Sequence, residues 1–96
     1  MVLEKEIRVV SQIIQKFGAS RIILFGSCAY RSIEEAHDID ILCYGVDSHR
    51  WLEMCNEVGK SVYSAVDIVD ALDIDDELRC DWEGYGKLLF DKNSSH

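Results

Sequence analysis

Apolar positions recur along the start of the chain with the spacing of a helix. They stand three and four residues apart with polar side chains between them, which is typical of a helix that packs one face on a core; they are Val2, Leu3, Ile7, Val10, Ile13, Ile14 and Phe17. Gly18 follows, at a place where helices often end in a left-handed residue. The pattern predicts a helix that ends at Gly18.

Short runs rich in branched apolar residues predict the strands. Residues 21–25 and 65–70 are two such runs, and residues 87–90 suit a short edge strand. Residues 38–44 alternate acidic and apolar side chains at first and then turn wholly apolar. This last run is typical of a strand whose beginning is exposed and whose end is buried.

Two further helices are expected between these strands. Asp47 or Ser48 can cap a helix over residues 51–62. The acid-rich stretch 75–77 suits the first turn of another helix, which would stop near Gly84 or Gly86. Residues 28–35 are expected to form a short helical turn and a loop.

The element order predicts an α/β (α+β) fold, in which a small mixed β-sheet has its helices packed on one side. With 96 residues the chain is long enough for one compact domain and too short for two. We expect a single domain over 1–92 and a disordered polar tail at 93–96.

The charge balance limits the classes of partner. The chain carries 18 acidic and 10 basic side chains, a formal net charge of −8. A nucleic-acid binder needs a basic face to displace counterions from phosphates, so no nucleic-acid partner is expected. A basic protein partner is compatible with this charge, and a homo-oligomer stays open.

The expected compartment is the cytoplasm. The longest apolar stretch, residues 22–25, is far too short for a membrane span, and no leader-like segment precedes the first helix. The four cysteines form no C-x-x-C pair and the three histidines are scattered, so no zinc spacing appears. Reduced thiols in a cytoplasmic protein, away from membranes, explain this pattern.

Two carboxylates at the start of a predicted strand carry the candidate chemistry. Asp38 and Asp40 stand two residues apart, so both point to one face of the strand while Ile39 turns to the other. Like charges held together are costly unless a cation lies between them, and Mg²⁺ prefers oxygen ligands of this kind. Asp67 occupies the same kind of position on the next predicted strand, and pairing of the two strands would bring a third carboxylate to the site.

The context of the acid pair separates it from a simple solvent-facing charge pair. A second Asp-x-Asp pair, Asp73 and Asp75, is interpreted as helix-start acids. Only the first pair follows a Gly-Ser turn, since ten residues separate Gly26-Ser27 from Asp38. Such a turn between a strand and a helix exposes backbone N–H groups that cradle phosphate oxygens, although Ser27 would also serve as a plain helix cap.

These residues resemble a known family. Gly26-Ser27 and, after ten residues, Asp38-Ile39-Asp40 are similar to the Gly-Ser…Asp-x-Asp motif of the DNA polymerase β-like nucleotidyltransferase superfamily. The closest resemblance is to its minimal nucleotidyltransferase (MNT) branch, which includes the antitoxins of HEPN–MNT pairs. The resemblance covers most of the chain, including the strand around Asp67 and the ending 83–90.

The resemblance implies a role for each matched residue. Gly26 and Ser27 would contact the triphosphate of ATP, and Asp38 and Asp40 would bind Mg²⁺, with two ions expected. Asp67 would complete the acid triad, share the metal and help to deprotonate the incoming hydroxyl. The family commonly continues Gly-Ser with Arg-Ala-Arg-Gly, whereas here Cys28 and Tyr30 replace both arginines and Arg31 takes the glycine position. Arg31 is the basic residue left to reach the phosphates.

The function implied is Mg²⁺-dependent transfer of NMP, expected to be AMP from ATP, to a hydroxyl acceptor. By the same resemblance the acceptor would be a tyrosine of a HEPN-type partner protein, with the chain acting as its antitoxin. The alternative is a catalytically weak or inactive module that binds nucleotide or neutralises a partner by contact. The replaced arginines favour this alternative, and the acid triad opposes it.

Overall fold

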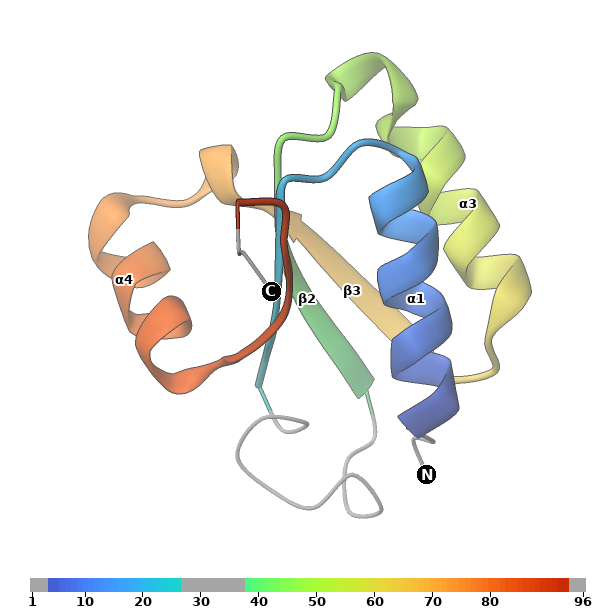
Figure 1. The fold of residues 1–96 in the computed structure, drawn as a ribbon, viewed down its shortest axis with the longest axis horizontal. Helices are drawn as coiled ribbons and strands as arrows, with labels where there is room; N and C mark the ends of the chain where they lie inside the picture. The colour runs from blue at the N-terminus through green and yellow to red at the C-terminus, as the bar shows by residue number, and fades with distance from the viewer. Residues whose placement is uncertain (1–3, 27–37, 94–96) are drawn as a thin grey trace.

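The computed structural model describes residues 4–26 and 38–93. Four strands form one sheet in the order β3-β2-β1-β4 (Figure 1). Strand β1 is antiparallel to both of its neighbours, whereas β2 and β3 run parallel. The sheet is therefore mixed, as predicted; its strands are β1 (Arg21–Phe25), β2 (Asp38–Tyr44), β3 (Ala65–Asp70) and β4 (Lys87–Asp91).

Three helices and two short 3-10 helices lie within the described residues. The α-helices are α1 (Glu4–Lys16), α3 (Trp51–Ser61) and α4 (Asp76–Tyr85); the 3-10 helices are η2 (Ser48–Arg50) and η3 (Ala71–Asp73). The three α-helices are confirmed as predicted, with α1 followed by Gly18 at a φ of +97°, whereas the 3-10 helix η3 was not predicted. The helical turn expected at 28–35 and the tail at 93–96 lie wholly or largely outside the described residues.

Aspartate side chains cap three of these helices; in η3 the Asp70 carboxylate accepts a hydrogen bond from the Leu72 N–H at 3.0 Å. The Asp47 carboxylate accepts a hydrogen bond from the His49 N–H at 2.9 Å and so opens η2, which leads into α3. The Asp75 carboxylate accepts from the Leu78 N–H at 2.8 Å and opens α4. Asp75 thus satisfies an orphan N–H of the first turn, and the interpretation of the second Asp-x-Asp pair as helix-start acids is confirmed for this residue.

The main core lies between the sheet and the pair α1 and α3. Alternate strand residues turn toward these two helices, and the innermost side chains are fully buried: Val10, Ile14, Ile22, Ile39, Ile41, Met54 and Val58. Helix α1 places Ile7, Val10 and Ile14 on this face because they recur at helical spacing. Fourteen buried residues of the described chain gather in this core, against three in the second cluster, so this core should supply most of the hydrophobic stabilisation.

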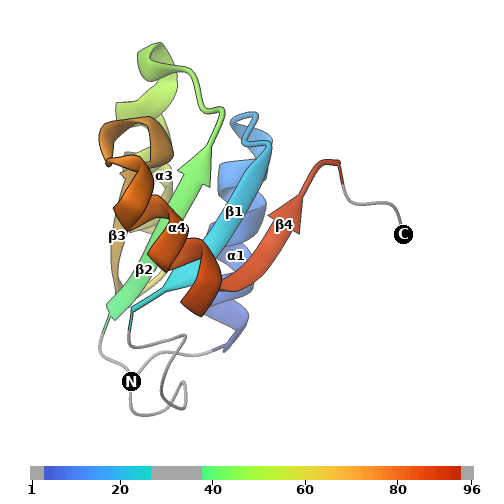
Figure 2. The same cartoon turned by 90° about the vertical axis from the view of Figure 1, so that its left-hand side faces the viewer.

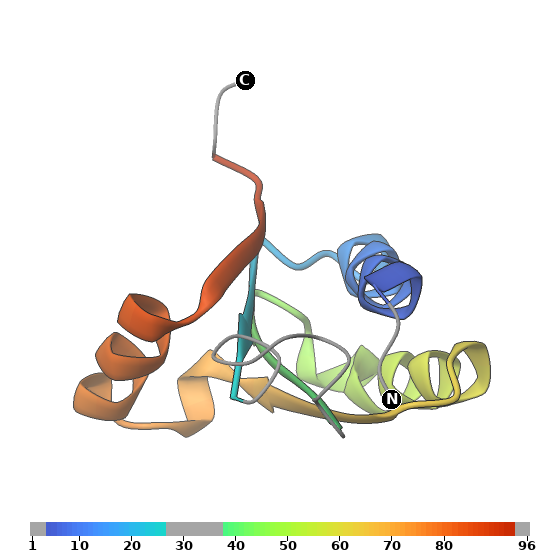
Figure 3. The same ribbon diagram turned by 90° about the horizontal axis from the view of Figure 1, so that it is seen from below.

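Helix α4 covers the opposite face of the sheet. Figure 3 shows the sheet between α4 on one side and α1 with α3 on the other, and Figure 2 shows α4 crossing in front of β1 and β2. A second, smaller cluster fills this side, with Ile23, Leu42 and Ala71 buried and Trp82 packed against them. The expected packing of helices on one side holds for α1 and α3 and not for α4, because the alternate residues of β1 and β2 on the second face are also apolar.

Candidate active site

The three predicted acids lie on the α4 face of the sheet. Leu42 of β2 belongs to the cluster beneath α4, whereas Ile39 and Ile41 belong to the main core. Because strand side chains alternate, Asp38 and Asp40 share the face of Leu42. The arrangement spares both carboxylates from the main core and leaves Asp38 exposed and Asp40 partly buried.

The register of the parallel pair places Asp67 directly opposite Asp40. Asp38 is two register pairs away and lies opposite Ala65. The two strands therefore bring Asp40 and Asp67 together on one face, at the end of the sheet where β1 finishes. The sequence alone left this point undecided, because a one-residue shift in register would turn Asp67 to the other face.

Gly26 packs against the carboxylate of Asp40. The residue follows β1 with a φ of +71°, in the left-handed region. A Cβ at this position would lie 2.3 Å from Oδ2 of Asp40. Both the backbone conformation and the close approach require glycine. Gly26, the first residue of the predicted phosphate turn, therefore lies against Asp40, a predicted metal ligand.

The electrostatics of the site favour a bound cation. Partial burial raises the pKa of the Asp40 carboxyl above its usual range, and the charges of Asp67 and Asp38 raise it further. An ionised carboxylate with two acidic neighbours is destabilised by desolvation and by repulsion. A positive ion placed among these oxygens would relieve both effects.

The donor set fits a Mg²⁺ ion that is shared with a triphosphate. Within residues 4–26 and 38–93, no three Asp, Glu, His or Cys side chains are already gathered as a metal site. Mg²⁺ does not need such a cage, since it is commonly held by one or two carboxylates, with phosphate oxygens and water completing the octahedron. Asp40, with Asp67 opposite it and Asp38 beside it, supplies that many carboxylates.

An aromatic stack forms the wall next to Asp40. Phe25 is the register partner of Asp40 on β1. Its ring stacks on Trp82 of α4, with centroids 4.1 Å apart and planes 10° apart. Through this contact Trp82 packs helix α4 against the end of β1. No local pattern in the sequence pairs Trp82 with Phe25.

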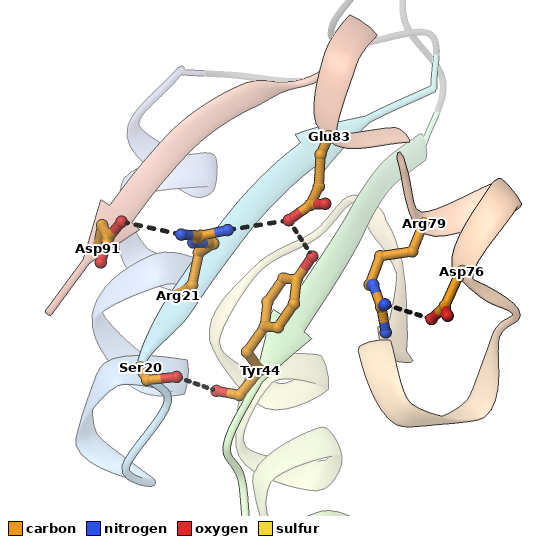
Figure 4. A network of polar contacts seen from close by, with 7 residues as sticks. All are labelled: Ser20, Arg21, Tyr44, Asp76, Arg79, Glu83 and Asp91. Atoms are coloured by element: carbon orange, nitrogen blue, oxygen red, sulfur yellow. Dashed lines mark hydrogen bonds and ion pairs between the residues drawn. The ribbon is translucent and has the colours of Figure 1, made fainter. Parts of the chain in front are cut away.

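A polar network fixes α4 at the far end of β1 and β2. Figure 4 shows Glu83 of α4 accepting hydrogen bonds from the Arg21 guanidinium at 2.9 Å and the Tyr44 hydroxyl at 2.5 Å. Arg21 also pairs with Asp91 at 3.4 Å and lies over the Tyr44 ring. Burial, together with the neighbouring Glu83, raises the pKa of Tyr44 to about 12. Tyr44 therefore supports α4 as a neutral hydroxyl.

Two predicted site residues, Ser27 and Arg31, lie outside the described residues, as do Cys28 and Tyr30. The sequence profile described as polymerase beta, nucleotidyltransferase matches residues 8–95. The chain belongs to the polymerase β nucleotidyltransferase family. The resemblance drawn from Gly26-Ser27 and Asp38-Ile39-Asp40 is thereby confirmed at the level of the family, and the metal and nucleotide roles of individual residues stay predictions.

Solved structures share the fold of this nucleotidyltransferase domain. One is the tri-AMPylated Shewanella oneidensis HEPN toxin in complex with MNT antitoxin, with 22% identity and a TM-score of 0.67 over 92% of this chain and 71% of that chain. Another is a toxin–antitoxin with AMP-PNP, with 24% identity and a TM-score of 0.67 over 95% and 76%. The toxin–antitoxin MntA–HepT matches with 21% identity and a TM-score of 0.64 over 93% and 73%.

At these identities the likeness shows the fold. No protein with a curated description matches the chain. None of the helices in the described parts of the chain is both long enough and apolar enough to cross a membrane.

Proposed function

We propose that this domain is a Mg²⁺-dependent nucleotidyltransferase that transfers AMP from ATP to a hydroxyl group of a protein. The observation that carries the proposal is the pairing of Asp40 with Asp67 on one face of the sheet, with Gly26 in contact with the Asp40 carboxylate. A purely structural strand pair has no need for two opposed carboxylates, which repel one another. The family assignment supports the same reaction class.

The roles of the chain's own residues follow from their positions. Asp38 and Asp40 would hold the metal, which supplies positive charge for the triphosphate and the leaving pyrophosphate. Gly26 and Ser27 would bind phosphate oxygens through backbone N–H groups, and Arg31 would add a side-chain cation. Asp67, opposite Asp40, would share the metal and accept the proton of the attacking hydroxyl.

The reaction itself is a single displacement at phosphorus. The acceptor oxygen bonds to the α-phosphorus, the bond from that phosphorus to the bridging oxygen of the β-phosphate breaks, and pyrophosphate leaves with the electron pair. The proton of the hydroxyl passes to Asp67. Positioning and charge neutralisation account for most of the catalysis in such transfers.

A protein acceptor is favoured because of the matching solved structures. One contains a tri-AMPylated HEPN toxin with its MNT antitoxin, and another toxin–antitoxin contains AMP-PNP. We propose the same arrangement for this chain: an antitoxin that modifies a tyrosine of a HEPN-type partner in the cytoplasm. The net charge of −8 suits a partner with a basic surface.

The test is transfer of α-labelled ATP, with Mg²⁺, to the proteins of a host-cell lysate. The doubly substituted Asp38→Asn/Asp40→Asn protein is the inactive variant, and Asp73→Asn/Asp75→Asn is its matched control with the same charge change on the second Asp-x-Asp pair. A labelled band that vanishes only in the first variant supports the proposal and identifies the acceptor. Absence of label, together with no rise in melting temperature on adding ATP and Mg²⁺, would contradict it.

A second candidate is neutralisation of the partner by contact alone. Cys28 and Tyr30, at the positions where the family commonly has arginine, favour this candidate because they remove two cations from the phosphate turn. Asp40→Asn separates the two functions in cells that express the partner. Loss of neutralisation indicates AMP transfer, and intact neutralisation by a folded Asp40→Asn protein indicates contact.

A further inference from the structure

Glu6 is a buried carboxylate on the apolar face of α1. Its exposed fraction is 6%, and it lies one helical turn before Val10, which is fully buried. Burial of a charged group at a core position is costly unless hydrogen bonds compensate it. An apolar side chain in that place would often stabilise the fold equally well. Packing alone therefore does not explain why a carboxylate occupies this position.

The carboxylate of Glu6 is bound to the segment that leads into β3. One oxygen accepts hydrogen bonds from the Tyr63 N–H at 2.6 Å and the Ser64 N–H at 3.3 Å. The other oxygen accepts from the Ser64 hydroxyl at 2.7 Å. These charge-assisted contacts are directional, and they attach the two residues before Ala65, where β3 begins, to the start of α1.

The register of β3 benefits from such a device because the apolar residues of this strand are only partly buried. None of the six residues of β3 is fully buried, and exposed and partly buried residues alternate along its first half. In β2, by contrast, four of seven residues are buried. Val66 and Ile68 of β3 pack against the main core but are only partly buried, and the register of a strand is specified less strongly where neither face is fully buried. Strands β2 and β3 are parallel and joined through α3, so no tight turn sets their register either.

We propose that Glu6 is a positioning residue that sets the register of β3 and thereby holds Asp67 opposite Asp40. A shift by one residue would turn Asp67 to the α1 and α3 face and bring an apolar neighbour, Val66 or Ile68, to the α4 face. The proposal rests on the proposed function for the catalytic role of Asp67. The control of register by Glu6 is independent of that role.

The chain allows a conservative replacement at this site. In Glu6→Gln the amide oxygen accepts from the two backbone N–H groups, and the amide nitrogen donates to the Ser64 hydroxyl, which can also accept. Each of these three hydrogen bonds keeps a partner, so this variant is expected to behave like the wild type. Glu6→Ala removes all of these contacts, and Ser64→Ala removes only the contact of the hydroxyl.

The experiment reads the register and the activity separately. Backbone NOEs that pair Asp40 with Asp67 report the register in isotope-labelled protein without any substrate. Transfer of α-labelled ATP to the acceptor reports the activity, with kcat and KM for ATP measured separately. Val58→Ala is the stability control, because Val58 is buried in the main core and takes no part in the hydrogen bonds of Glu6.

The expected result for Glu6→Ala is loss of the Asp40–Asp67 NOEs and a fall of about 100-fold in kcat, since small misplacements of catalytic groups cost about that much. KM for ATP should stay within about twofold, because the substitution leaves the proposed phosphate-binding residues Gly26 and Ser27 unchanged. Glu6→Gln should restore both readouts. Val58→Ala should keep the NOEs and lose less than about threefold in kcat at a temperature where it is folded.

Retention of the Asp40–Asp67 NOEs in Glu6→Ala would overturn the proposal, whatever its activity. If Glu6→Ala does not fold, Ser64→Ala decides. A rise in amide exchange relative to the wild type that is larger in β3 than in β1 supports the proposal, and exchange rates equal to those of the wild type overturn it. If the register shifts as expected while the wild type itself transfers no label, the inference about Glu6 stands and the proposed function fails.

Discussion

The two faces of the sheet differ in how completely they are covered. Helices α1 and α3 close one face, where the innermost side chains have no exposed surface. On the other face α4 contributes no fully buried residue, and its cluster has only three buried members. The first face supplies the stability of the domain, and the second leaves polar groups at the edge of the sheet within reach of solvent.

The difference between the two faces explains how strand β2 contributes both to the core and to the candidate site. Its odd-numbered positions from Ile39 to Cys43 enter the main core, whereas Asp38 and Asp40 share the α4 face. Because the apolar side chains on one face of β2 are packed in the main core, the backbone of β2 is held in place and positions the carboxylates on its other face. The cost is the unfavourable environment of Asp40, whose pKa is raised by partial burial and by two acidic neighbours.

The largest expected effect concerns activity on the α4 face. Asp67→Asn should lower the rate of AMP transfer by about 10²–10³-fold, because a lost metal-activating carboxylate removes several kcal/mol of transition-state stabilisation. The melting temperature of the metal-free protein should not fall. Single-turnover transfer of labelled ATP measures the effect, with Asp73→Asn as the matched control. If the Asp67→Asn protein keeps the activity of the wild type, Asp67 has no catalytic role.

A truncation on the α1 and α3 face should act on stability instead. Ile41→Ala empties a fully buried position and should lower the free energy of unfolding by about 2–5 kcal/mol. Leu72→Ala, at a side chain that is 85% exposed near α4, should change it by less than about 0.5 kcal/mol. Urea denaturation measures both. Equal losses would contradict the account, because Leu72 has little packing to lose.

The contact between Gly26 and Asp40 affects both the stability of the domain and its proposed activity. Gly26→Ala puts a Cβ 2.3 Å from the Asp40 carboxylate, at a φ of +71°. The left-handed backbone alone should cost about 1–2 kcal/mol of stability, and displacement of Asp40 should also weaken binding of ATP with Mg²⁺. In Gly59→Ala the new methyl meets open space within α3, so a gain of about 0.5–1 kcal/mol is expected. Thermal unfolding with and without ATP and Mg²⁺ compares the pair.

The smallest effect is a dependence of stability on pH. Because the pKa of Asp40 is raised on folding, the native state binds the proton more tightly, and stability falls as pH rises from the unfolded pKa through the folded one. Above that window ionised Asp40 destabilises the metal-free protein. Asp40→Asn should therefore melt at a higher temperature than the wild type at neutral pH in the presence of a chelator.

The advantage of Asp40→Asn should disappear when the pH is lowered below the usual range of an aspartate pKa. An advantage that is independent of pH would assign it to another cause, such as a new hydrogen bond of the amide.

The sequence predicted the elements well because each has a distinct local signal. The apolar spacing in α1, the branched runs of β1 to β3 and the acidic start of α4 all agree with the structure. The choice of face for α4 had no such signal, since Ile23 and Leu42 are as apolar as the residues that face α1. Local patterning shows which residues seek burial, and tertiary packing decides which helix covers them.

The candidate site was predictable only in part for the same reason. Asp38, Asp40 and Gly26 stood out through spacing and context, but the pairing of Asp67 with Asp40 depends on register, which single residues do not reveal. Glu6 carried a signal that is evident in retrospect: an acid four residues before Val10 interrupts the apolar stripe of α1. The stack of Phe25 on Trp82 joins residues too far apart for any sequence pattern.

The most direct test of the α4 face as the reactive face is paramagnetic line broadening by Mn²⁺, added with ATP to isotope-labelled protein. Mn²⁺ takes the oxygen ligands that Mg²⁺ uses, and it broadens the amide signals nearest to it. We predict that the signals of Gly26, Asp40 and Asp67 broaden first and that Asp40→Asn abolishes the effect. Broadening centred on Asp73 and Asp75, or broadening that survives in Asp40→Asn, would contradict the account.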